Sequence, residues 1–342
     1  FYMGINIGAF VCNFFGAALY TTIGWGAAFM AAGVGMFIGV ITFIAGTKHY
    51  KEYDVRKPLQ EGDMPLWKIL ASVILPSILF GVIGWFIKGD QYIFDSNSTD
   101  AFIFACIPVI YFYTSLYIRA EASEKRPIAA LLAIFAAVVM FWAVFKQNGT
   151  ALTRWANYYT DRQVTGTTEK ALSAIYLVES KDFQTKEVQK YDNQFKAEKN
   201  EADEPIKVQG KDVYFTNVSA EQKAVLEQEP SKKVSLINTE LFQSVNPGWI
   251  ILLTPLVVGF FTFMRRRGKE PSTPSKIVLG LFISALSCLV MIGAVYFGSN
   301  GAVKVSPLWL VGTYGVITIG ELCLSPMGLS IVSKLSPPRL TA

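Results

Sequence analysis

The stretch "GTYGVITIGELCLSPMGLSIVS", residues 312 to 333, is apolar enough to cross a membrane and has a single carboxylate, Glu321, near its centre. A helix needs about 20 apolar residues to span the ~30 Å hydrocarbon core of a bilayer. A charged side chain in the middle of such a helix costs roughly 2.5–3.5 kcal/mol on insertion scales, so it usually faces a cavity or a partner. We therefore expect Glu321 to have a specific environment inside the protein.

Similar apolar stretches recur along the chain, near residues 1–20, 25–46, 65–87, 101–118, 127–146, 248–264, 277–298 and 306–333. Hydrophobic residues make up 52% of the 342 residues and charged residues only 17%. Because most of these stretches reach or approach the length of a membrane-spanning helix, we predict an all-α polytopic membrane protein. The sequence begins inside an apolar stretch, and we expect it to be part of a longer protein.

The positions of the basic residues predict the orientation. If alternate loops face opposite sides, the loops near 47–64, 119–126, 265–276 and 334–342 share one side. These loops hold most of the Lys and Arg residues that lie outside 155–240. The positive-inside rule places this side in the cytoplasm, within a multi-pass topology. The formal net charge of +5 is explained by this asymmetry, and we expect no nucleic-acid partner.

Residues 155–240 form the largest break in composition, because they are polar and rich in charge. We expect an insertion of mixed structure on the extracytoplasmic side, with strand-like patches such as "DVYF" (212–215) and helix-like ones such as "EQKAVLEQ" (221–228). The insertion contains no His or Cys, so we expect no metal site there and interpret it as a small structural or partner-binding domain. The four cysteines of the chain lie in apolar stretches without close spacing, which predicts neither a disulfide framework nor a zinc site. No cofactor or metal is expected.

The stretch around Glu321 carries a polar stripe. Tyr314, Thr318, Glu321 and Ser325 step by four, three and four residues, which places them on one face of a helix. A polar face on an otherwise apolar span predicts a surface lined by water or protein rather than by lipid. The alternative is a buried, hydrogen-bonded Glu that only specifies helix packing.

Polar residues in other spans allow two interpretations each. Lys146 lies four residues after Trp142, within reach of a cation–π contact, and Gln147 follows it; Lys146 could equally extend to the interface. Asn6 could face a pocket or make an interhelical hydrogen bond. Asn246 precedes a proline and could be a helix N-cap followed by Pro at the first helical position.

Two classes of function fit these residues. A transporter needs a polar central cavity and a titratable group within it. A membrane scaffold or membrane enzyme would place its chemistry in the soluble insertion or at the interface. The mid-span acid and the absence of His and Cys from 155–240 favour transport over an enzyme.

Several segments resemble the proton-dependent oligopeptide transporter family (POT/PTR), a branch of the major facilitator superfamily. "FYMGINIGAF" (1–10) resembles its Asn-Gly signature. "FWAVFKQNGTALTRWA" (141–156), "FQSVNPGWIILLTPL" (242–256) and "GELCLSPMGLSIVSKLSPPRL" (320–340) are similar to its seventh, eighth and tenth core helices. The resemblance implies a partial major facilitator fold that starts at the fifth core helix and ends after the tenth.

The resemblance also implies a division of the chain into segments. Residues 1–46 would end the N-terminal six-helix half, 47–64 would be a cytoplasmic linker, and 65–119 an inserted transmembrane hairpin of the type found in bacterial members. Residues 120–154 would be the first span of the C-terminal half, interrupted by the insertion at 155–240 and continued by three spans in 241–342.

Carried over residue by residue, the resemblance implies a site for one di- or tripeptide. Asn6 and Asn246 match amides that contact the peptide backbone, and Trp142 matches an aromatic wall. Glu321 matches the acid that pairs with the peptide's amino terminus, so that a proton and a cationic substrate can compete for one group. Lys146 departs from the family pattern, since relatives commonly hold a proton-coupling acid there. We expect it either to neutralise an acid on a helix outside this sequence or to titrate itself.

Weaker pocket candidates are Tyr314, Gln147 and Ser325. The resemblance as a whole implies symport of peptides and protons by alternating access across the bacterial inner membrane, with protons as the coupling ion and the lipid bilayer as the surroundings. It does not indicate an oligomeric state. The alternatives are a transporter of another small solute within the same family, or a membrane scaffold whose 155–240 insertion binds a partner.

Overall fold

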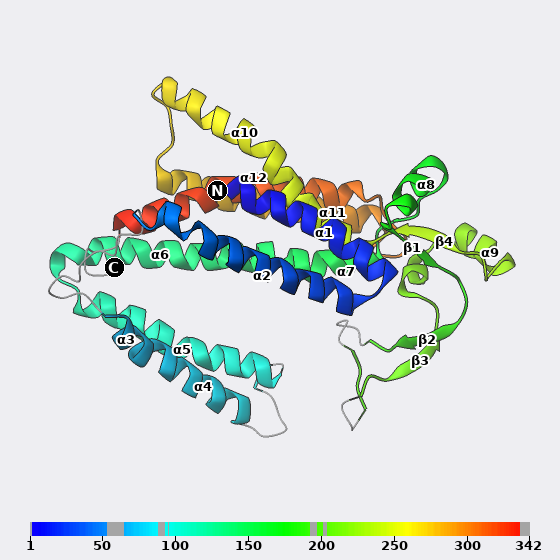
Figure 1. Cartoon of the computed structure of the whole chain (residues 1–342), viewed down its shortest axis with the longest axis horizontal. Coiled ribbons are helices and arrows are strands. Elements are labelled where there is room, and N and C mark those ends of the chain that lie inside the picture. The colour runs from blue at the N-terminus through cyan, green and yellow to red at the C-terminus, as the bar shows by residue number, and fades with distance from the viewer. Residues whose placement is uncertain are drawn as a thin grey trace. The chain divides into compact units, whose positions relative to one another are not determined.

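The computed structural model describes residues 2–52, 65–87, 93–94, 96–191, 197–200 and 204–335, with side chains of the last helix described up to Leu324 (Figure 1). The chain forms two compact units. Unit 1 comprises Phe1–Ala45 with Phe141–Ser325, and unit 2 comprises Gly46–Met140 with Pro326–Ala342.

Long helices dominate both units. Within the described residues, seven helical segments are long and apolar enough to cross a membrane. They are α1 (Tyr2–Thr22), α2 (Trp25–Tyr50), the segment Trp67–Phe86, α5 (Asn97–Arg119), the segment Ala122–Tyr158, the segment Thr239–Arg266 and α11 (Thr273–Phe297). A further helix, α12 (Leu308–Leu335), is apolar over Leu308–Leu324. The prediction of an all-α polytopic membrane protein is confirmed.

Some of these segments consist of several elements. Trp67–Phe86 lies within α3 (Leu66–Ile69), the π-helical turn η1 (Leu70–Ile74) and α4 (Leu75–Phe86). Ala122–Tyr158 contains α6 (Ala122–Phe145), the 3-10 turn η2 (Lys146–Gly149) and α7 (Ala151–Tyr158). Thr239–Arg266 contains the 3-10 helix η4 (Thr239–Ser244) and α10 (Val245–Arg266).

The hairpin in unit 2 is built on small residues. A Cβ added to Gly84 of α4 would lie 2.7 Å from the carbonyl oxygen of Asp100 and 2.8 Å from Cβ of Phe104, both in α5. Only glycine permits this close approach. Asp100 is itself buried and accepts hydrogen bonds from the backbone N–H groups of Ile93 (2.6 Å) and Phe94 (2.9 Å). The carboxylate thereby holds the chain that enters α5.

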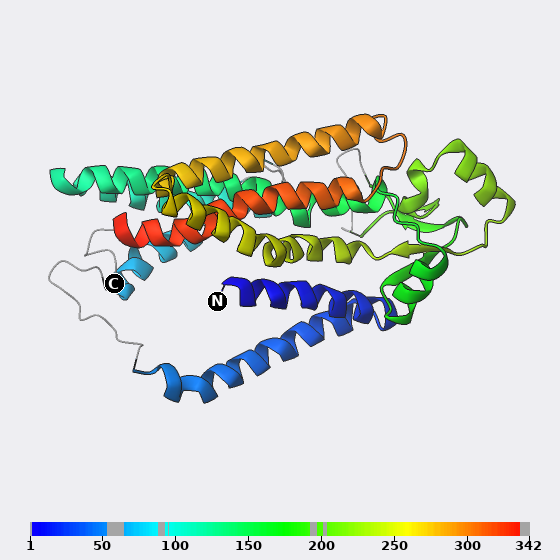
Figure 2. The same ribbon diagram turned by 90° about the horizontal axis from the view of Figure 1, so that it is seen from above.

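The polar insertion lies at one end of the unit 1 helices (Figure 2). It contains α8 (Gly166–Ala174), α9 (Ala220–Gln228) and the 3-10 helix η3 (Val213–Asn217). Within its described residues, two antiparallel strand pairs complete it: β1 (Val178–Lys181) with β4 (Val234–Ile237), and β2 (Lys186–Gln189) with β3 (Lys207–Gly210). Its small apolar core consists of Phe183, Tyr214, Phe215 and Leu236, with Val218, Leu226 and Val234 packed against them.

Of the two sequence patterns quoted for the insertion, one is confirmed by the structure and the other is wrong. "EQKAVLEQ" is helical, in α9. The expectation of a strand at "DVYF" is wrong, because Val213–Asn217 is the 3-10 helix η3. The Asp212 side chain accepts a hydrogen bond from the backbone N–H of Tyr214 (3.1 Å) and so caps a tight turn. Such local side-chain bonds compete with extended structure.

Candidate functional site

The polar stripe on α12 is buried inside unit 1. Tyr314 is 1% exposed, Thr318 is 0% exposed and Glu321 is 6% exposed. These residues follow one another by four and three positions and therefore share a helix face. The prediction was a face lined by water or protein rather than by lipid, and these three residues are buried within the protein.

Asn246, at the start of α10, joins two residues of this stripe. Its side-chain amide nitrogen donates to Oγ1 of Thr318 (2.9 Å) and to Oε2 of Glu321 (3.1 Å). The Thr318 hydroxyl in turn donates to the backbone carbonyl of Tyr314 (2.6 Å). Asn246 is buried like its partners, so these bonds are made away from solvent. The four residues form one polar cluster between α10 and α12, called here the Asn246–Glu321 cluster.

The interpretation of Asn246 as a helix N-cap is wrong. Helix α10 begins one residue earlier, at Val245, and is preceded directly by η4. Because the chain enters α10 from another helical turn, the Asn246 side chain is not needed at the helix end and points to α12. Pro247 is tolerated there, since the first N–H groups of a helix have no intrahelical partner.

Close helix packing fixes the position of Glu321. Gly320, its neighbour in α12, lies against α11: an added Cβ would meet Oγ of Ser284 and the carbonyl oxygen of Gly280, the latter at 2.7 Å. On the α10 side, the indole N–H of Trp249 donates to the carbonyl of Val311 (3.0 Å). Helix α12 is thus packed against both α10 and α11, and this packing fixes the position of the Glu321 carboxylate.

Tyr314 has a buried hydroxyl that makes no hydrogen bond to any described residue. A buried hydroxyl without a partner costs about 1–3 kcal/mol. The tyrosine lies one turn before Thr318 on the same face, so this oxygen is an available hydrogen-bonding group on the polar side of α12.

Asn6 is buried on α1, while Gly4 and Gly8 beside it are exposed. Helix α1 lies along η4 and α10: the hydroxyl of Ser244 donates to the carbonyl of Phe10 (3.2 Å), and the Phe10 ring lies 3.1 Å from where a Cβ of Gly248 would be. Asn6 therefore belongs to the helix that packs against the α10 end carrying Asn246.

Trp142, Lys146 and Gln147 lie on exposed surface of α6 and η2. The Lys146 ammonium is 5.4 Å from the centre of the Trp142 ring, which confirms the predicted cation–π contact. Gln147 donates to the carbonyl of Ala143 (3.3 Å) and lines a cavity of about 510 Å³ together with Arg154, Trp155 and others. Ser325 lies in α12, beyond the side chains that the structure describes.

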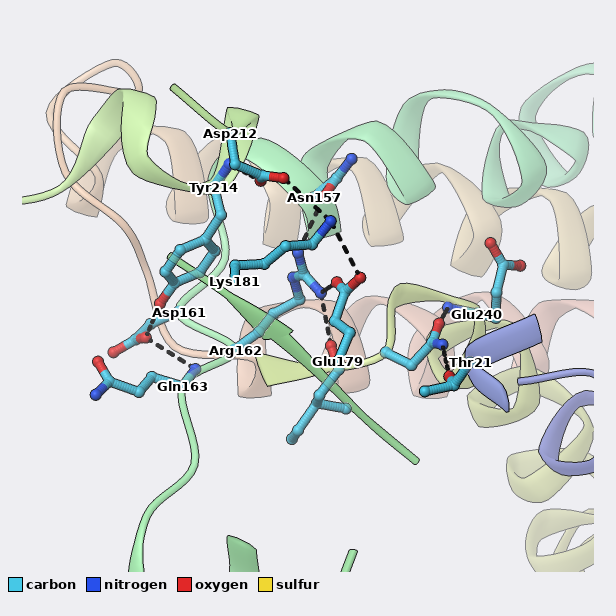
Figure 3. A network of polar contacts seen from close by, with 12 residues as sticks. Thr21, Asn157, Asp161, Arg162, Gln163, Glu179, Lys181, Asp212, Tyr214 and Glu240 are labelled. Atoms are coloured by element: carbon cyan, nitrogen blue, oxygen red, sulfur yellow. Dashed lines mark hydrogen bonds and ion pairs between the residues drawn. The ribbon is translucent and has the colours of Figure 1, made fainter. Parts of the chain in front are cut away.

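A second polar network, which the sequence did not indicate, lies at the base of the insertion (Figure 3). Its centre is Arg162, only 1% exposed, which forms an ion pair with Glu179 (2.7 Å). Arg162 also donates to the carbonyl of Ile237 (2.6 Å) and to Oδ1 of Asn157 (3.0 Å). Lys181 lies 3.5 Å from the same glutamate and 3.0 Å from Asp212. The charges in this network largely compensate one another.

The network extends to the loop between α11 and α12. Lys304 donates to the carbonyl of Tyr158 (2.8 Å) and lies 4.2 Å from the centre of the Tyr214 ring. Burial, together with the positive charge of Arg162, lowers the pKa of Lys304 to about 8, against the opposing effect of nearby carboxylates. Burial and the neighbouring Asp161 raise the pKa of Tyr214, whose hydroxyl donates to Asp161 at 2.9 Å.

Backbone pairing joins the same segments. Val305 accepts from the N–H of Asp161 and donates to the carbonyl of Tyr159, both at 2.9 Å. At the side facing α1, the Asn238 amide donates to the hydroxyl of Thr21 (3.2 Å), and its oxygen accepts from the N–H of Glu240 (3.0 Å). The insertion is thus attached both to the α11–α12 loop and to the end of α1.

The chain is similar to known membrane transporters. The model of the POT family (PTR2) matches residues 1–172 and 229–342, which leaves 173–228, within the insertion, outside the match. The uncharacterized transporter YclF of Bacillus subtilis is 27% identical over all of this chain and 55% of its own length. The dipeptide and tripeptide permease A of Proteus mirabilis is 25% identical over 99% of this chain and 54% of its own.

A crystal structure of the peptide transporter POT in complex with alafosfalin is 25% identical, with a TM-score of 0.57 over 100% of this chain and 55% of that one. The chain therefore spans about half the length of the relatives it matches. Together with the membrane-spanning helices and the match of the family model over most of the sequence, these likenesses establish that the chain belongs to the POT family.

Proposed function

We propose that the protein imports di- and tripeptides together with protons across the bacterial inner membrane, by alternating access. Membership of the POT family supports the transport class. The substrate class is supported by the permease of Proteus mirabilis, a dipeptide and tripeptide permease by name, and by the peptide transporter solved with alafosfalin.

The observation that carries the proposal is the buried carboxylate of Glu321 beside the Asn246 amide. Removing a carboxylate from water is costly, so a mid-span acid needs polar partners. The Asn246 amide is a neutral partner. A carboxylate beside a neutral amide can exchange a proton for the ammonium of a peptide, which links the two transported species through one group.

The roles proposed for the other site residues are those of the matching positions in the POT family. Asn6 and Asn246 would bind the peptide backbone, and Trp142 would form an aromatic wall. Lys146 and Glu321 would take part in proton coupling. Tyr314, Gln147 and Ser325 are weaker candidates and would line the same pocket.

The proposed orientation follows the positive-inside rule. The segments rich in Lys and Arg would face the cytoplasm, including the end of α10 with Arg265 and Arg266 and the following residue Arg267. The insertion, at the opposite end of α10 and α11, would then be extracytoplasmic.

Uptake of a labelled dipeptide by the intact protein in proteoliposomes tests the function, with and without an inward proton gradient. We expect the gradient to accelerate uptake, and Glu321→Gln to abolish this acceleration. Glu227→Gln, which removes an exposed carboxylate from α9 of the insertion, is the control and should keep it.

Different results would contradict different parts of the proposal. Uptake of another solute but no dipeptide would move the protein to the other small-solute branch of the family. Dipeptide uptake that ignores the gradient would refute proton coupling. A protein that carries no solute but binds a partner through the insertion would be a scaffold.

A further inference from the structure

In the Asn246–Glu321 cluster, Thr318 accepts a hydrogen bond from one of the two side-chain N–H groups of Asn246. A side-chain amide has two N–H groups on its nitrogen. In Asn246, one of them is used by Glu321 (3.1 Å) and the other by Thr318 (2.9 Å). Both donors are therefore committed, and both acceptors lie on the same face of α12, three residues apart.

The hydroxyl of Thr318 can act only as an acceptor toward this amide. A hydroxyl has one proton to donate, and Thr318 donates it to the carbonyl of Tyr314 (2.6 Å). The oxygen left for Asn246 is an acceptor, so it selects the NH₂ end of the amide and rejects the carbonyl end. If the amide were turned over, its oxygen would face both the Thr318 oxygen and the Glu321 carboxylate.

Burial makes this selection strict. Thr318 is 0% exposed, so water cannot replace its hydroxyl. A threonine that bonds back to a carbonyl one turn earlier on its helix is also held in one side-chain rotamer. The acceptor is thus fixed in position as well as in direction.

From this geometry we propose that Thr318 is a positioning residue, which orients the Asn246 amide so that its N–H points at the carboxylate of Glu321. The role in peptide binding rests on the proposed function. The orienting role rests on the contacts alone. Thr318 does not itself touch the transported peptide in this proposal; it acts through Asn246.

The chain provides a matched control on the same helix. Thr313 is also buried, at 3% exposure, and its hydroxyl donates to the carbonyl of Trp309 at 2.8 Å, again four residues earlier. Replacing either threonine by valine removes one hydroxyl and one back-bond while keeping the β-branched shape. Only Thr318 also accepts from Asn246.

The first readout does not depend on the substrate. A hydrophobic carbodiimide modifies carboxyl groups in membrane proteins, and the labelling rate of Glu321 is followed by peptide mass spectrometry in the intact protein. In the Thr318→Val variant the Asn246 amide is no longer oriented toward Glu321. Glu321 should then be labelled about 3- to 10-fold faster, which corresponds to the loss of one hydrogen bond to its carboxylate. Thr318→Ser, which keeps the hydroxyl, and Thr313→Val should both label at the rate of the unmodified protein.

The second readout is transport. Thr318→Val should raise KM for a dipeptide with a free amino terminus on the order of 10-fold, the loss expected when a hydrogen bond to a charged group is weakened. The inhibition constant of the same dipeptide carrying an N-acetyl group should rise less than this, because that peptide has no ammonium to pair with Glu321 and can lose only its backbone contact with Asn246.

Coupling to Asn246 completes the test. In an Asn246→Leu background, Thr318→Val should have no additional effect on labelling, because the amide that it orients is gone. The proposal is overturned if Thr318→Val labels like the unmodified protein, if Thr318→Ser is as affected as Thr318→Val, or if the valine effect persists without Asn246. Altered labelling in a protein that transports no dipeptide would leave the orienting role standing and refute only the proposed substrate.

Discussion

Replacing Arg162 by methionine should destabilise the insertion strongly. The arginine is 1% exposed, pairs with Glu179 at 2.7 Å and donates to Ile237 and Asn157. Removing one partner of a buried ion pair typically costs about 3–5 kcal/mol, because the other charge remains buried. Lys181, at 3.5 Å, still compensates Glu179 in part, which favours the lower end of this range. At about 1.4 kcal/mol per factor of ten, the open form of the insertion should become roughly 10²- to 10³-fold more populated.

Native-state proteolysis of the intact protein in lipid nanodiscs measures this population, because cleavage within the paired strands β1 (Val178–Lys181) and β4 (Val234–Ile237) requires local opening. Lys232→Met is the control. It removes a surface ion pair with Glu229 (3.0 Å) in which both side chains are about two-thirds exposed, and such pairs contribute only about 0–1 kcal/mol. The double variant Arg162→Met with Glu179→Gln should recover part of the loss. If Arg162→Met is cleaved no faster than Lys232→Met, the arginine does not stabilise the insertion and the reasoning fails.

Two further predictions concern helix packing and pH. Gly320→Ala should lower the free energy of unfolding by about 1–3 kcal/mol, because the new Cβ meets Ser284. Gly312→Ala is the control and should be neutral, because its Cβ would have only ordinary contacts. Equal melting temperatures for the two variants would argue against the close approach at Gly320. The folded protein lowers the pKa of Lys304 from 10.5 to about 8, so the unfolded chain binds more protons in this range and stability should rise between pH 8 and pH 10. Lys304→Met should remove this rise in the proteolysis assay, and an unchanged pH profile would count against the buried position of the lysine.

The approximate positions and the apolar nature of the long helices could be read from the sequence because a membrane span has a strong local signature. In a bilayer, a run of about 20 apolar residues can form few structures other than a spanning helix. The polar stripe on α12 was equally accessible, since its spacing of three and four residues is a property of the helix alone. Burial of Tyr314, Thr318 and Glu321 followed from that spacing.

The partner of the stripe could not be read in the same way. Asn246 lies 72 residues from Thr318, and the bond between them depends on how α10 and α12 pack. Locally, an asparagine before a proline is typical of a helix cap, and the preceding turn η4 removes the need for one. Thr318 was visible on the stripe, but its role requires both of its hydrogen bonds to be seen.

The insertion was the least predictable part. Short strands and 3-10 turns carry weak patterns, and at "DVYF" one local contact from Asp212 decided for a turn. The Arg162 network joins segments that are far apart in sequence: Arg162 pairs with Glu179, 17 residues away, and donates to Ile237, 75 residues away. Composition alone indicated only a charged, polar segment.

The pairing of Val305 with Tyr159 and Asp161 sets an order of events during synthesis. A ribosome makes about 5–20 residues per second, so the roughly 65 residues between the end of the insertion and Val305 take about 3–13 s to appear. For that interval the nascent insertion lacks the edge contributed by residues 304 and 305, although its own strands are already complete. A chain that stops within α11 therefore carries an unfinished domain, which proteases can recognise before the remaining helices have been made.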